Sequence, residues 1–259
     1  MRLATRTWGE EGLPLAVLLH GLAASSLTWW RIGPWFAANG WHAVAVDLRG
    51  HGASPKASGD EQLGDLAEDV HETVAGLLGP EERIDVVLGH SLGALTALGF
   101  CGLYGELVRR AVLEDPPGSE SADAEETARE VEEAADRAKE APDDLVRELM
   151  EETSWAREDC EMAVQSLREC DARRLAAMRR GLHWNLTGLA GFLEVPALLV
   201  LGTDARGSGL PEPERSAVAG ALRGGTVEVL ETGHFVHRDD FEGYVRLLGG
   251  WLGEPGRRC

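Results

Sequence analysis

Short runs of apolar residues alternate along the chain with longer segments in which apolar positions recur every three or four residues. The runs are rich in Val, Leu and Ala, which is typical of strands buried on both faces of a parallel sheet. The predicted strands are Leu15–Leu19, Trp41–Asp47, Ile84–Leu88, Ala111–Leu113, Ala197–Leu201 and Val227–Leu230. The predicted covering helices are Asp60–Leu78, Leu92–Tyr104 and Asp239–Leu252. The pattern therefore predicts an α/β fold with a mostly parallel central sheet flanked by helices. The alternating segment Arg2–Trp8 is predicted to add an edge hairpin.

One long segment interrupts this alternation. About 80 residues between the fourth and fifth of these strands keep helical spacing but contain no strand pattern. Within them, residues 114–161 hold 19 acidic and 5 basic side chains. An excursion of this length inside a compact domain is usually a lid or a subdomain. We therefore expect residues 116–190 to form a helical cap, inserted after the sixth strand if the hairpin is counted, and residues 1–115 and 191–259 to form the core.

The charge balance restricts the partners of the protein. The 259 residues carry 44 acidic and 25 basic side chains, a net charge of −19, which repels phosphate backbones and anionic membranes. We expect neither nucleic acid nor a membrane as partner, and a small molecule as substrate. No apolar run approaches the roughly 20 residues of a membrane span, and no signal-peptide pattern is present. The four cysteines (Cys101, Cys160, Cys170 and Cys259) lack zinc-site spacing, which favours free thiols in the cytoplasm.

The clearest chemical signal is the string G-H-S-L-G at residues 89–93. It follows one predicted strand directly and opens the predicted helix Leu92–Tyr104. In a nucleophile elbow, the serine occupies a strained turn between a strand and a helix, which exposes its hydroxyl above the sheet. Glycines two positions before and after the serine leave room for such a turn. We therefore interpret Ser91 as a nucleophile.

A serine hydroxyl needs a general base to become nucleophilic at neutral pH. Among the eight histidines, His234 has the most suitable place. It follows Gly233 in the loop after the last predicted strand and precedes the C-terminal helix. We predict His234 to be the base, and His237 to lie in the first helical turn or the pocket wall.

These motifs resemble those of the serine-dependent α/β-hydrolase family, in which nucleophile, acid and histidine follow one another in this chain order. His20-Gly21-Leu22 is similar to the H-G-x oxyanion loop of the family, and D-L-R-G-H-G-A-S at residues 47–54 is similar to its D-x-R-G-x-G-x-S turn. The resemblance covers residues 1–115 and 195–253. It implies that the backbone N–H groups of Leu22 and Leu92 form an oxyanion hole. It also implies structural roles for Asp47, Arg49 and His51.

The acid of the predicted triad has two candidates. The family usually carries G-x-x-D after its seventh strand, whereas this chain has Gly202-Thr203-Asp204, with the aspartate one residue early. Asp204 is the preferred acid. The alternative is Asp115, directly after the strand Ala111–Leu113, where haloalkane dehalogenases and certain lactone hydrolases supply theirs. Glu114 is the weakest candidate. Either aspartate could orient an imidazole and stabilise its protonated form.

The predicted reaction is hydrolysis of a carboxylic ester or lactone without metal or organic cofactor. A serine at position 91 excludes the family members that use an aspartate nucleophile, the haloalkane dehalogenases and epoxide hydrolases. Hydrolysis of a C–C bond in a diketone, or of a thioester, would use the same triad, and a non-catalytic binding protein is a further alternative. We expect an apolar substrate pocket between cap and sheet. Its predicted residues are Gly21, Trp29, Trp30, His90, Trp155 and Trp184.

Overall fold

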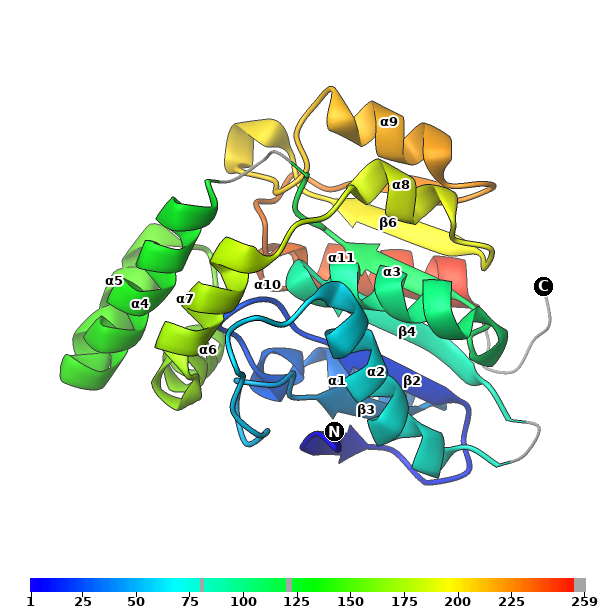
Figure 1. Cartoon of the computed structure of the whole chain (residues 1–259), viewed down its shortest axis with the longest axis horizontal. Helices are drawn as coiled ribbons and strands as arrows, with labels where there is room; N and C mark the ends of the chain where they lie inside the picture. Colours follow the sequence, from blue (N-terminus) through cyan, green and yellow to red (C-terminus); the bar gives the residue numbers. More distant parts are fainter. Residues whose placement is uncertain (80–81, 120–122, 254–259) are drawn as a thin grey trace.

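The apolar runs form a seven-stranded sheet in the computed structural model, which describes residues 1–79, 82–119 and 123–253 (Figure 1). The strand order is β1-β3-β2-β4-β5-β6-β7. The bounds are Thr5–Trp8 (β1), Leu15–Leu19 (β2), His42–Val46 (β3), Ile84–His90 (β4), Ala111–Glu114 (β5), Ala197–Leu201 (β6) and Thr226–Val229 (β7). Neighbouring strands from β2 to β7 pair in parallel, whereas β1 is antiparallel to β3. The predicted fold class is therefore confirmed.

The predicted N-terminal hairpin is wrong. Within Arg2–Trp8 only Thr5–Trp8 forms a strand, and it pairs with β3, from Thr5 opposite Val46 to Trp8 opposite Ala43. A hairpin would require β1 to pair with the next strand, β2, but β3 lies between them. The segment therefore forms a single edge strand, in which Thr5, Arg6 and Thr7 are exposed and Trp8 is half-buried.

Alternate residues of the sheet face two separate cores. In β2, Val17 and Leu19 join one core, and Ala16 and Leu18 join the other, as the two-residue period of a strand requires. The first core is covered by α2 (Leu63–Val74), α3 (Leu92–Tyr104), α8 (Leu186–Gly191) and α9 (Glu214–Ala221). The second is covered by α1 (Ile32–Ala38) and α11 (Phe241–Leu252). The sheet is thus the middle of three layers (Figure 1).

The predicted helices differ from the observed ones mainly at their ends. Leu92–Tyr104 is α3 with the predicted bounds. The segment predicted as Asp60–Leu78 contains α2 followed by the 3-10 helix η2 (Ala75–Leu77). The segment predicted as Asp239–Leu252 is α11, which begins at Phe241 because the side chain of Asp240 accepts a hydrogen bond from Gly243 N–H and caps the helix. The short helix α10 (Val236–Asp239) precedes it. The remaining 3-10 helices are η1 (Ser26–Trp29), η3 (Gly105–Leu107) and η4 (Asp204–Arg206).

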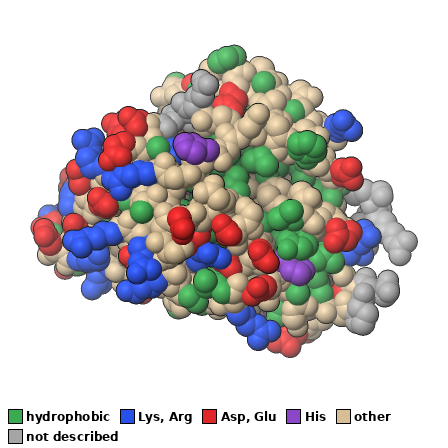
Figure 2. All heavy atoms as spheres, viewed as in Figure 1, with side chains coloured by type: hydrophobic (Ala, Val, Ile, Leu, Met, Phe, Trp, Pro, Cys, Tyr) green, Lys and Arg blue, Asp and Glu red, His purple; other side chains and the backbone are tan. Residues whose placement is uncertain are grey.

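The acidic insert is helical, and it follows the fifth strand, β5, instead of the predicted sixth, because the N-terminal segment forms one strand and not a hairpin. Its helices are α4 (Ala124–Glu140), α5 (Pro142–Glu152), α6 (Arg157–Glu169) and α7 (Ala172–Gly181). They lie to the left of the sheet in Figure 1, where α4 packs on α5, α6 and α7. A small core of their own contains Ala138, Leu145, Val146, Cys160 and Val164. Acidic and basic side chains lie interspersed over this part of the surface (Figure 2).

The division into core and cap stays a prediction. Helix α8 falls within the predicted cap range 116–190, yet it packs on α3 and α9 beside the sheet. The predicted ranges include residues 120–122 and 254–259, and these, with Cys259, lie outside the described residues. Cys101, Cys160 and Cys170 are free thiols. In the described part of the chain, no helix combines the length and apolarity that crossing a membrane requires.

Candidate active site

Ser91 lies on a strained turn between β4 and α3. Its backbone has φ 54° and ψ −118°, and its N–H donates to the carbonyl of Glu114 at 2.9 Å. A side chain at either flanking glycine would collide with backbone. A Cβ on Gly89 would lie 2.1 Å from the carbonyl oxygen of Gly93, and one on Gly93 would lie 2.1 Å from that of Leu19. The glycines of the motif are therefore required by close backbone approach at the elbow.

His234 connects Ser91 to a buried carboxylate. Its Nε2 lies 3.0 Å from Ser91 Oγ, and its Nδ1 lies 2.6 Å from Asp115 Oδ2. An ionised carboxylate can only accept hydrogen bonds, so Nδ1 carries the proton and Nε2 is free to accept the Ser91 hydroxyl proton. The His234 side chain is 28% exposed, which leaves the reacting side of the ring open to a substrate.

Asp115 is held from several sides at the end of β5. Its side chain is fully buried, and its backbone has φ 41°, a region that aspartate tolerates better than most residues. Besides His234, it accepts hydrogen bonds from Gly202 N–H (3.1 Å), Ser208 Oγ–H (2.7 Å) and Gly209 N–H (2.6 Å). These donors compensate the buried charge and fix the carboxylate against the imidazole.

The structure corrects the preference for Asp204 as the acid. Asp204 begins η4, and its side chain is 47% exposed and forms an ion pair with Arg215. The turn at η4 follows β6 so closely that the carboxylate faces α9 instead of His234. Asp115 occupies the place beside the imidazole because β5 lies between β4 and β6, directly beside the strand that carries Ser91.

The predicted oxyanion loop lies against the elbow. A Cβ on Gly21 would be 2.9 Å from His90 Nδ1 and 3.2 Å from Ser91 Cβ, so only glycine allows this approach. Leu92 is the first residue of α3, and its N–H therefore has no acceptor within the helix. The amides of Leu22 and Leu92 thus belong to two segments that meet at Ser91.

Two buried histidines hold the oxyanion loop. His20 bonds the Gly21 carbonyl through Nδ1 (2.8 Å) and accepts from Leu48 N–H through Nε2 (3.0 Å). His51 accepts from Ala23 N–H through Nε2 (3.0 Å) and bonds the Arg49 carbonyl through Nδ1 (2.9 Å). Burial lowers the pKa of His20, and burial, followed by the electrostatic effect of the neighbouring His20 imidazole, lowers the pKa of His51 to about 3. Both rings are therefore neutral, as their acceptor roles require.

The D-L-R-G-H-G-A-S turn supports the same loop. Asp47 accepts from Ser26 N–H (2.6 Å) and from Ala53 N–H (3.0 Å), which ties the turn to η1. Arg49 forms ion pairs with Asp69 and Glu61. The contacts of this turn are with backbone, with Asp69 of α2 and with Glu61 just before that helix, and they agree with the structural role that the resemblance implied.

The prediction that Trp29 lines the pocket is wrong. Trp29 is fully buried in the core beneath the sheet, with its ring 4.8 Å from that of His237. Of the other three indoles, those of Trp30 and Trp155 donate across the boundary between helices α4–α7 and the rest of the chain, and that of Trp184 donates to the segment after β5. Trp30 donates to Asp159 (2.8 Å), Trp155 to Asp239 (2.6 Å) and Trp184 to the Pro117 carbonyl (3.0 Å).

His90 and His237 lie behind Ser91 and His234. His90 is buried, and its Nε2–H donates to the His234 carbonyl at 2.9 Å. Burial lowers the pKa of His90 well below its usual value, so the ring is neutral. His237 is also buried, and its Nδ1 lies 2.7 Å from Glu114 Oε1 and its Nε2 2.9 Å from Thr28 Oγ1. His237 lies in the first turn of the short helix α10, as one of its two predicted places required, whereas the pocket-facing role predicted for His90 is wrong; both rings support the site from below.

Sequence reasoning missed the role of Glu114. Burial raises the pKa of this carboxyl, but the charge and hydrogen bonds of His237 outweigh burial and hold it below the usual value. Glu114 and Asp115 are consecutive at the end of β5, so their side chains leave on opposite sides. This alternation is the signal that could have separated the two: one acid reaches His234 and the other reaches His237.

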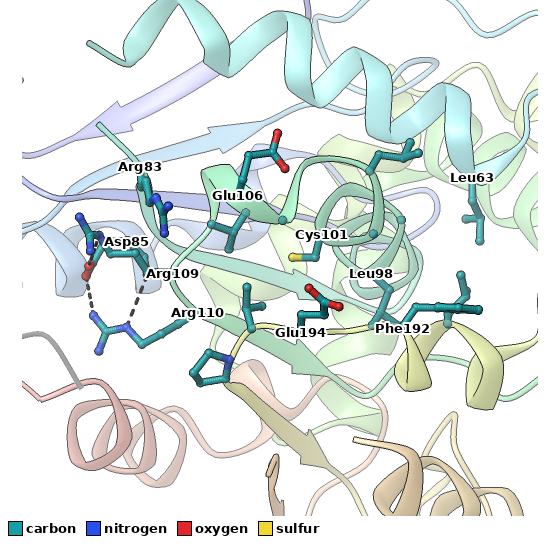
Figure 3. A pocket seen from close by; sticks show the side chains of 18 of the residues that line it. Leu63, Arg83, Asp85, Leu98, Cys101, Glu106, Arg109, Arg110, Phe192 and Glu194 are labelled. Carbon is teal, nitrogen blue, oxygen red and sulfur yellow. Dashed lines mark hydrogen bonds and ion pairs between the residues drawn. The ribbon is translucent and has the colours of Figure 1, made fainter. Parts of the chain in front are cut away.

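A separate cavity of about 1080 Å³ lies at the opposite end of the sheet (Figure 3). Its lining includes Asp85, Arg109 and Arg110, near the starts of β4 and β5, and apolar side chains of α3 and α8. Burial raises the pKa of the Cys101 thiol in its wall to about 12, so that this sulfur is a poor nucleophile. The lining of the cavity contains none of Ser91, His234 and Asp115.

A serine on a strand–helix elbow, beside a histidine and a buried aspartate at the carboxyl ends of parallel strands, defines the class of α/β hydrolases. The chain belongs to the alpha/beta hydrolase family, whose sequence profile matches residues 16–247. It is thus a hydrolase by family. Among the described residues, no cluster of His, Cys, Asp and Glu side chains is arranged to hold a metal ion.

Similar proteins within this fold include hydrolases of different kinds. The chain is 33% identical over 104 residues to the (E)-2-((N-methylformamido)methylene)succinate hydrolase of Acinetobacter baylyi, a match that covers 40% of this chain and only 37% of that protein. The enol-lactonase from Burkholderia xenovorans LB400 has a TM-score of 0.75 at 19% identity, over 97% of this chain and 96% of that one. A thermophilic esterase from Thermogutta terrifontis has a TM-score of 0.75 at 23% identity, over 96% and 92%. At such low identity, the two structural likenesses show the fold alone.

Proposed function

We propose that the protein is a serine hydrolase that cleaves a carboxylic ester or lactone of a small, largely apolar substrate. The observation that carries the proposal is the hydrogen-bonded series from Ser91 Oγ to His234 (3.0 Å) and from His234 to buried Asp115 (2.6 Å). A nucleophile, a base within reach of it and a group that orients the base are the parts that acyl transfer requires.

In the proposed reaction, Ser91 Oγ attacks the carbonyl carbon while its proton passes to His234 Nε2. Asp115 stabilises the resulting imidazolium without taking the proton. The tetrahedral intermediate collapses when the ester bond breaks, and His234 returns the proton to the leaving alkoxide. A water molecule then attacks the acyl-enzyme, again with His234 as base, and releases the acid and the free Ser91 hydroxyl.

The negative oxygen of the intermediate is proposed to bind the amides of Leu22 and Leu92. Donors fixed in advance stabilise a charge that develops only in the transition state, and one such donor is typically worth about 2.7–4 kcal/mol. The hydrogen bond from His20 to the Gly21 carbonyl supports this role, because it fixes the peptide unit that contains the Leu22 N–H. The side chains of Leu22 and Leu92 contribute nothing to this step.

The names of the structural relatives support the bond class. An enol-lactonase and an esterase share the fold over nearly the whole chain. Aromatic side chains near Ser91 fit an apolar substrate: the half-buried Phe235 follows His234, and Trp155 packs on Phe235 with 5.0 Å between ring centres. Thioester or diketone C–C hydrolysis would use the same triad, so both belong in the substrate tests.

The test is a hydrolysis screen over short-chain p-nitrophenyl esters, aromatic lactones, a thioester and a diketone, with wild type beside Ser91→Ala. We expect turnover of an ester or lactone that disappears in Ser91→Ala. Turnover of the thioester or diketone alone would move the proposal to that bond. Equal inactivity of wild type and variant over the whole screen would favour a non-catalytic binding protein.

A further inference from the structure

One carboxylate joins the acidic insert to the loop that carries the predicted base. Asp239 Oδ2 accepts from Gly233 N–H at 2.6 Å, and Asp239 Oδ1 accepts from the indole N–H of Trp155 at 2.6 Å. Gly233 immediately precedes His234, and Trp155 lies between α5 and α6 of the insert. The same side chain therefore contacts the backbone next to His234 and a side chain some 80 residues away in the sequence.

Trp155 is seated against that loop on more than one side. Its ring meets the ring of Phe235 edge to face, with 5.0 Å between their centres. The guanidinium of Arg238 lies 4.6 Å from the centre of the Trp155 ring and 5.0 Å from that of Phe235. Burial lowers the pKa of Arg238 to about 10, which still leaves the group charged at neutral pH and able to form cation–π contacts. Phe235, Arg238 and Asp239 all belong to the segment that follows His234.

The backbone around His234 is held at both of its ends. On one side, the His234 carbonyl accepts from His90 Nε2–H at 2.9 Å. On the other, the Gly233 amide donates to Asp239. The His90 bond comes from the elbow of the core, whereas the Asp239 bond depends on a carboxylate that also bonds the insert. A movement of Trp155 would thus shift the Asp239 carboxylate and, through it, the Gly233 amide.

We propose that Asp239 is a positioning residue, which makes the orientation of His234 depend on the seating of Trp155. The inference rests on the proposed function, because it assumes that His234 activates Ser91. With Trp155 seated, both carboxylate oxygens have donors and the Gly233–His234 backbone is fixed. When Trp155 leaves, Oδ1 loses its donor, the carboxylate rotates toward water and the imidazole loses its alignment. Misplacement of a catalytic group by about 1 Å can cost about 100-fold in rate.

The test uses a fluorophosphonate probe, which reports the reactivity of Ser91 without a known substrate. Ser91 Oγ attacks the phosphorus, fluoride leaves and His234 receives the hydroxyl proton. The maximal labelling rate and the half-saturating probe concentration are measured for wild type, Trp155→Phe, Asp239→Asn and the double variant. Phenylalanine keeps a ring against Phe235 and Arg238 but lacks the indole N–H. Asparagine at position 239 has a single acceptor oxygen, whereas the N–H groups of Gly233 and Trp155 each bond a separate carboxylate oxygen of Asp239.

A matched control is Trp41→Phe. Trp41 also donates its indole N–H to a buried carboxylate, Asp85, at 2.9 Å, but it lies at the far end of the sheet from Ser91. We expect Trp41→Phe to label at the wild-type rate even if its melting temperature falls. Ser91→Ala should not be labelled at all, which assigns the adduct to Ser91.

We expect the maximal labelling rate to fall about fivefold in Trp155→Phe and about 10- to 100-fold in Asp239→Asn, with little change in half-saturation. The double variant should equal Asp239→Asn, because both changes act through the same carboxylate. The inference would be overturned if Trp155→Phe were labelled at the wild-type rate, or if only the half-saturating probe concentration changed. It would also be overturned if the rate losses of the two single variants multiplied in the double variant. If Asp239→Asn does not fold, the comparison of the maximal labelling rates of Trp155→Phe and Trp41→Phe decides. Absence of labelling in folded wild type would overturn the proposed function, and the inference with it.

Discussion

At the scale of single residues, neutral histidines determine the shape of the oxyanion loop. His51 Nε2 accepts from the Ala23 amide, and protonation of that nitrogen would place two hydrogens against each other. The folded protein therefore resists protonation of His51, whose pKa lies at about 3, whereas an unfolded histidine titrates near 6.5. The hydrogen bond that His51 accepts from the Ala23 amide thus both fixes the loop and makes the stability of the folded protein sensitive to acid.

The pKa of His51 predicts the direction of a pH effect on stability. As the pH falls from about 6.5 toward 3, the unfolded chain binds a proton that the folded chain excludes, so the folded state loses about 1.4 kcal/mol per pH unit from this site. Urea unfolding of wild type and His51→Gln between about pH 7 and pH 5 measures this slope. The variant should lose stability less steeply, since glutamine can replace both hydrogen bonds without titrating. Parallel slopes would contradict the assignment.

Residues inside a motif could be predicted from the sequence, and the acid could not. Ser91 and His234 are fixed by neighbouring glycines and by their place after a strand. Asp115 and Asp204 both follow strands, and only the side-chain directions distinguish them. Asp204 is drawn to Arg215, a partner 11 residues away that no motif marks, whereas Asp115 is enclosed by Gly202, Ser208 and Gly209.

At the scale of elements, periodicity located the strands and α3 but did not give their pairing. The edge strand β1 alternates as a hairpin strand would, yet β3 separates it from β2. Helices α8 and α9, short and weakly patterned, were not predicted. The place of α8 beside α3 depends on packing between distant segments, which local spacing does not encode.

Helix α3 contains two glycines whose replacement should act in opposite directions. A Cβ on Gly93 would meet the carbonyl oxygens of Leu19 at 2.1 Å and His20 at 2.7 Å, so Gly93→Ala must displace β2 or the elbow. A Cβ on Gly102, in the same helix, meets nothing within 4 Å. We expect Gly93→Ala to lose at least about 2 kcal/mol of unfolding free energy and Gly102→Ala to gain about 1 kcal/mol. Urea unfolding measures both, and equal effects would contradict the close approach at the elbow.

At the scale of the whole molecule, the charge is unevenly distributed. Residues 114–161 account for a net −14 of the −19 carried by the chain. Arg180 of α7 reaches Glu125 (2.8 Å) and Glu132 (3.8 Å) of α4, but these groups are exposed, and such pairs contribute little to stability. The whole predicted cap, residues 116–190, carries 19 acidic and 10 basic side chains, so a net repulsion among carboxylates remains in the insert.

Salt should accordingly stabilise the folded protein. Raising the ionic strength from about 0.01 M to about 0.15 M shortens the screening length from about 30 Å to about 8 Å, which weakens repulsion across the insert more than contacts between paired groups. We expect the melting temperature to rise by a few degrees over this range, since about 1 kcal/mol corresponds to roughly 2–4 °C in a chain of this size. A falling melting temperature in scanning calorimetry would show that the ion pairs outweigh the repulsion.

The proposed hydrolysis requires Ser91, His234 and Asp115 to act as one catalytic unit. The most direct test is the turnover number of Asp115→Asn beside Asp204→Asn on the best substrate of the hydrolysis screen. Asparagine at position 115 would hold His234 in the wrong tautomer, and a change of this kind lowers kcat by about 10⁴-fold in a serine triad. We predict a loss of that size for Asp115→Asn and a change of less than about twofold for Asp204→Asn. A large loss in Asp204→Asn with an active Asp115→Asn would contradict the account.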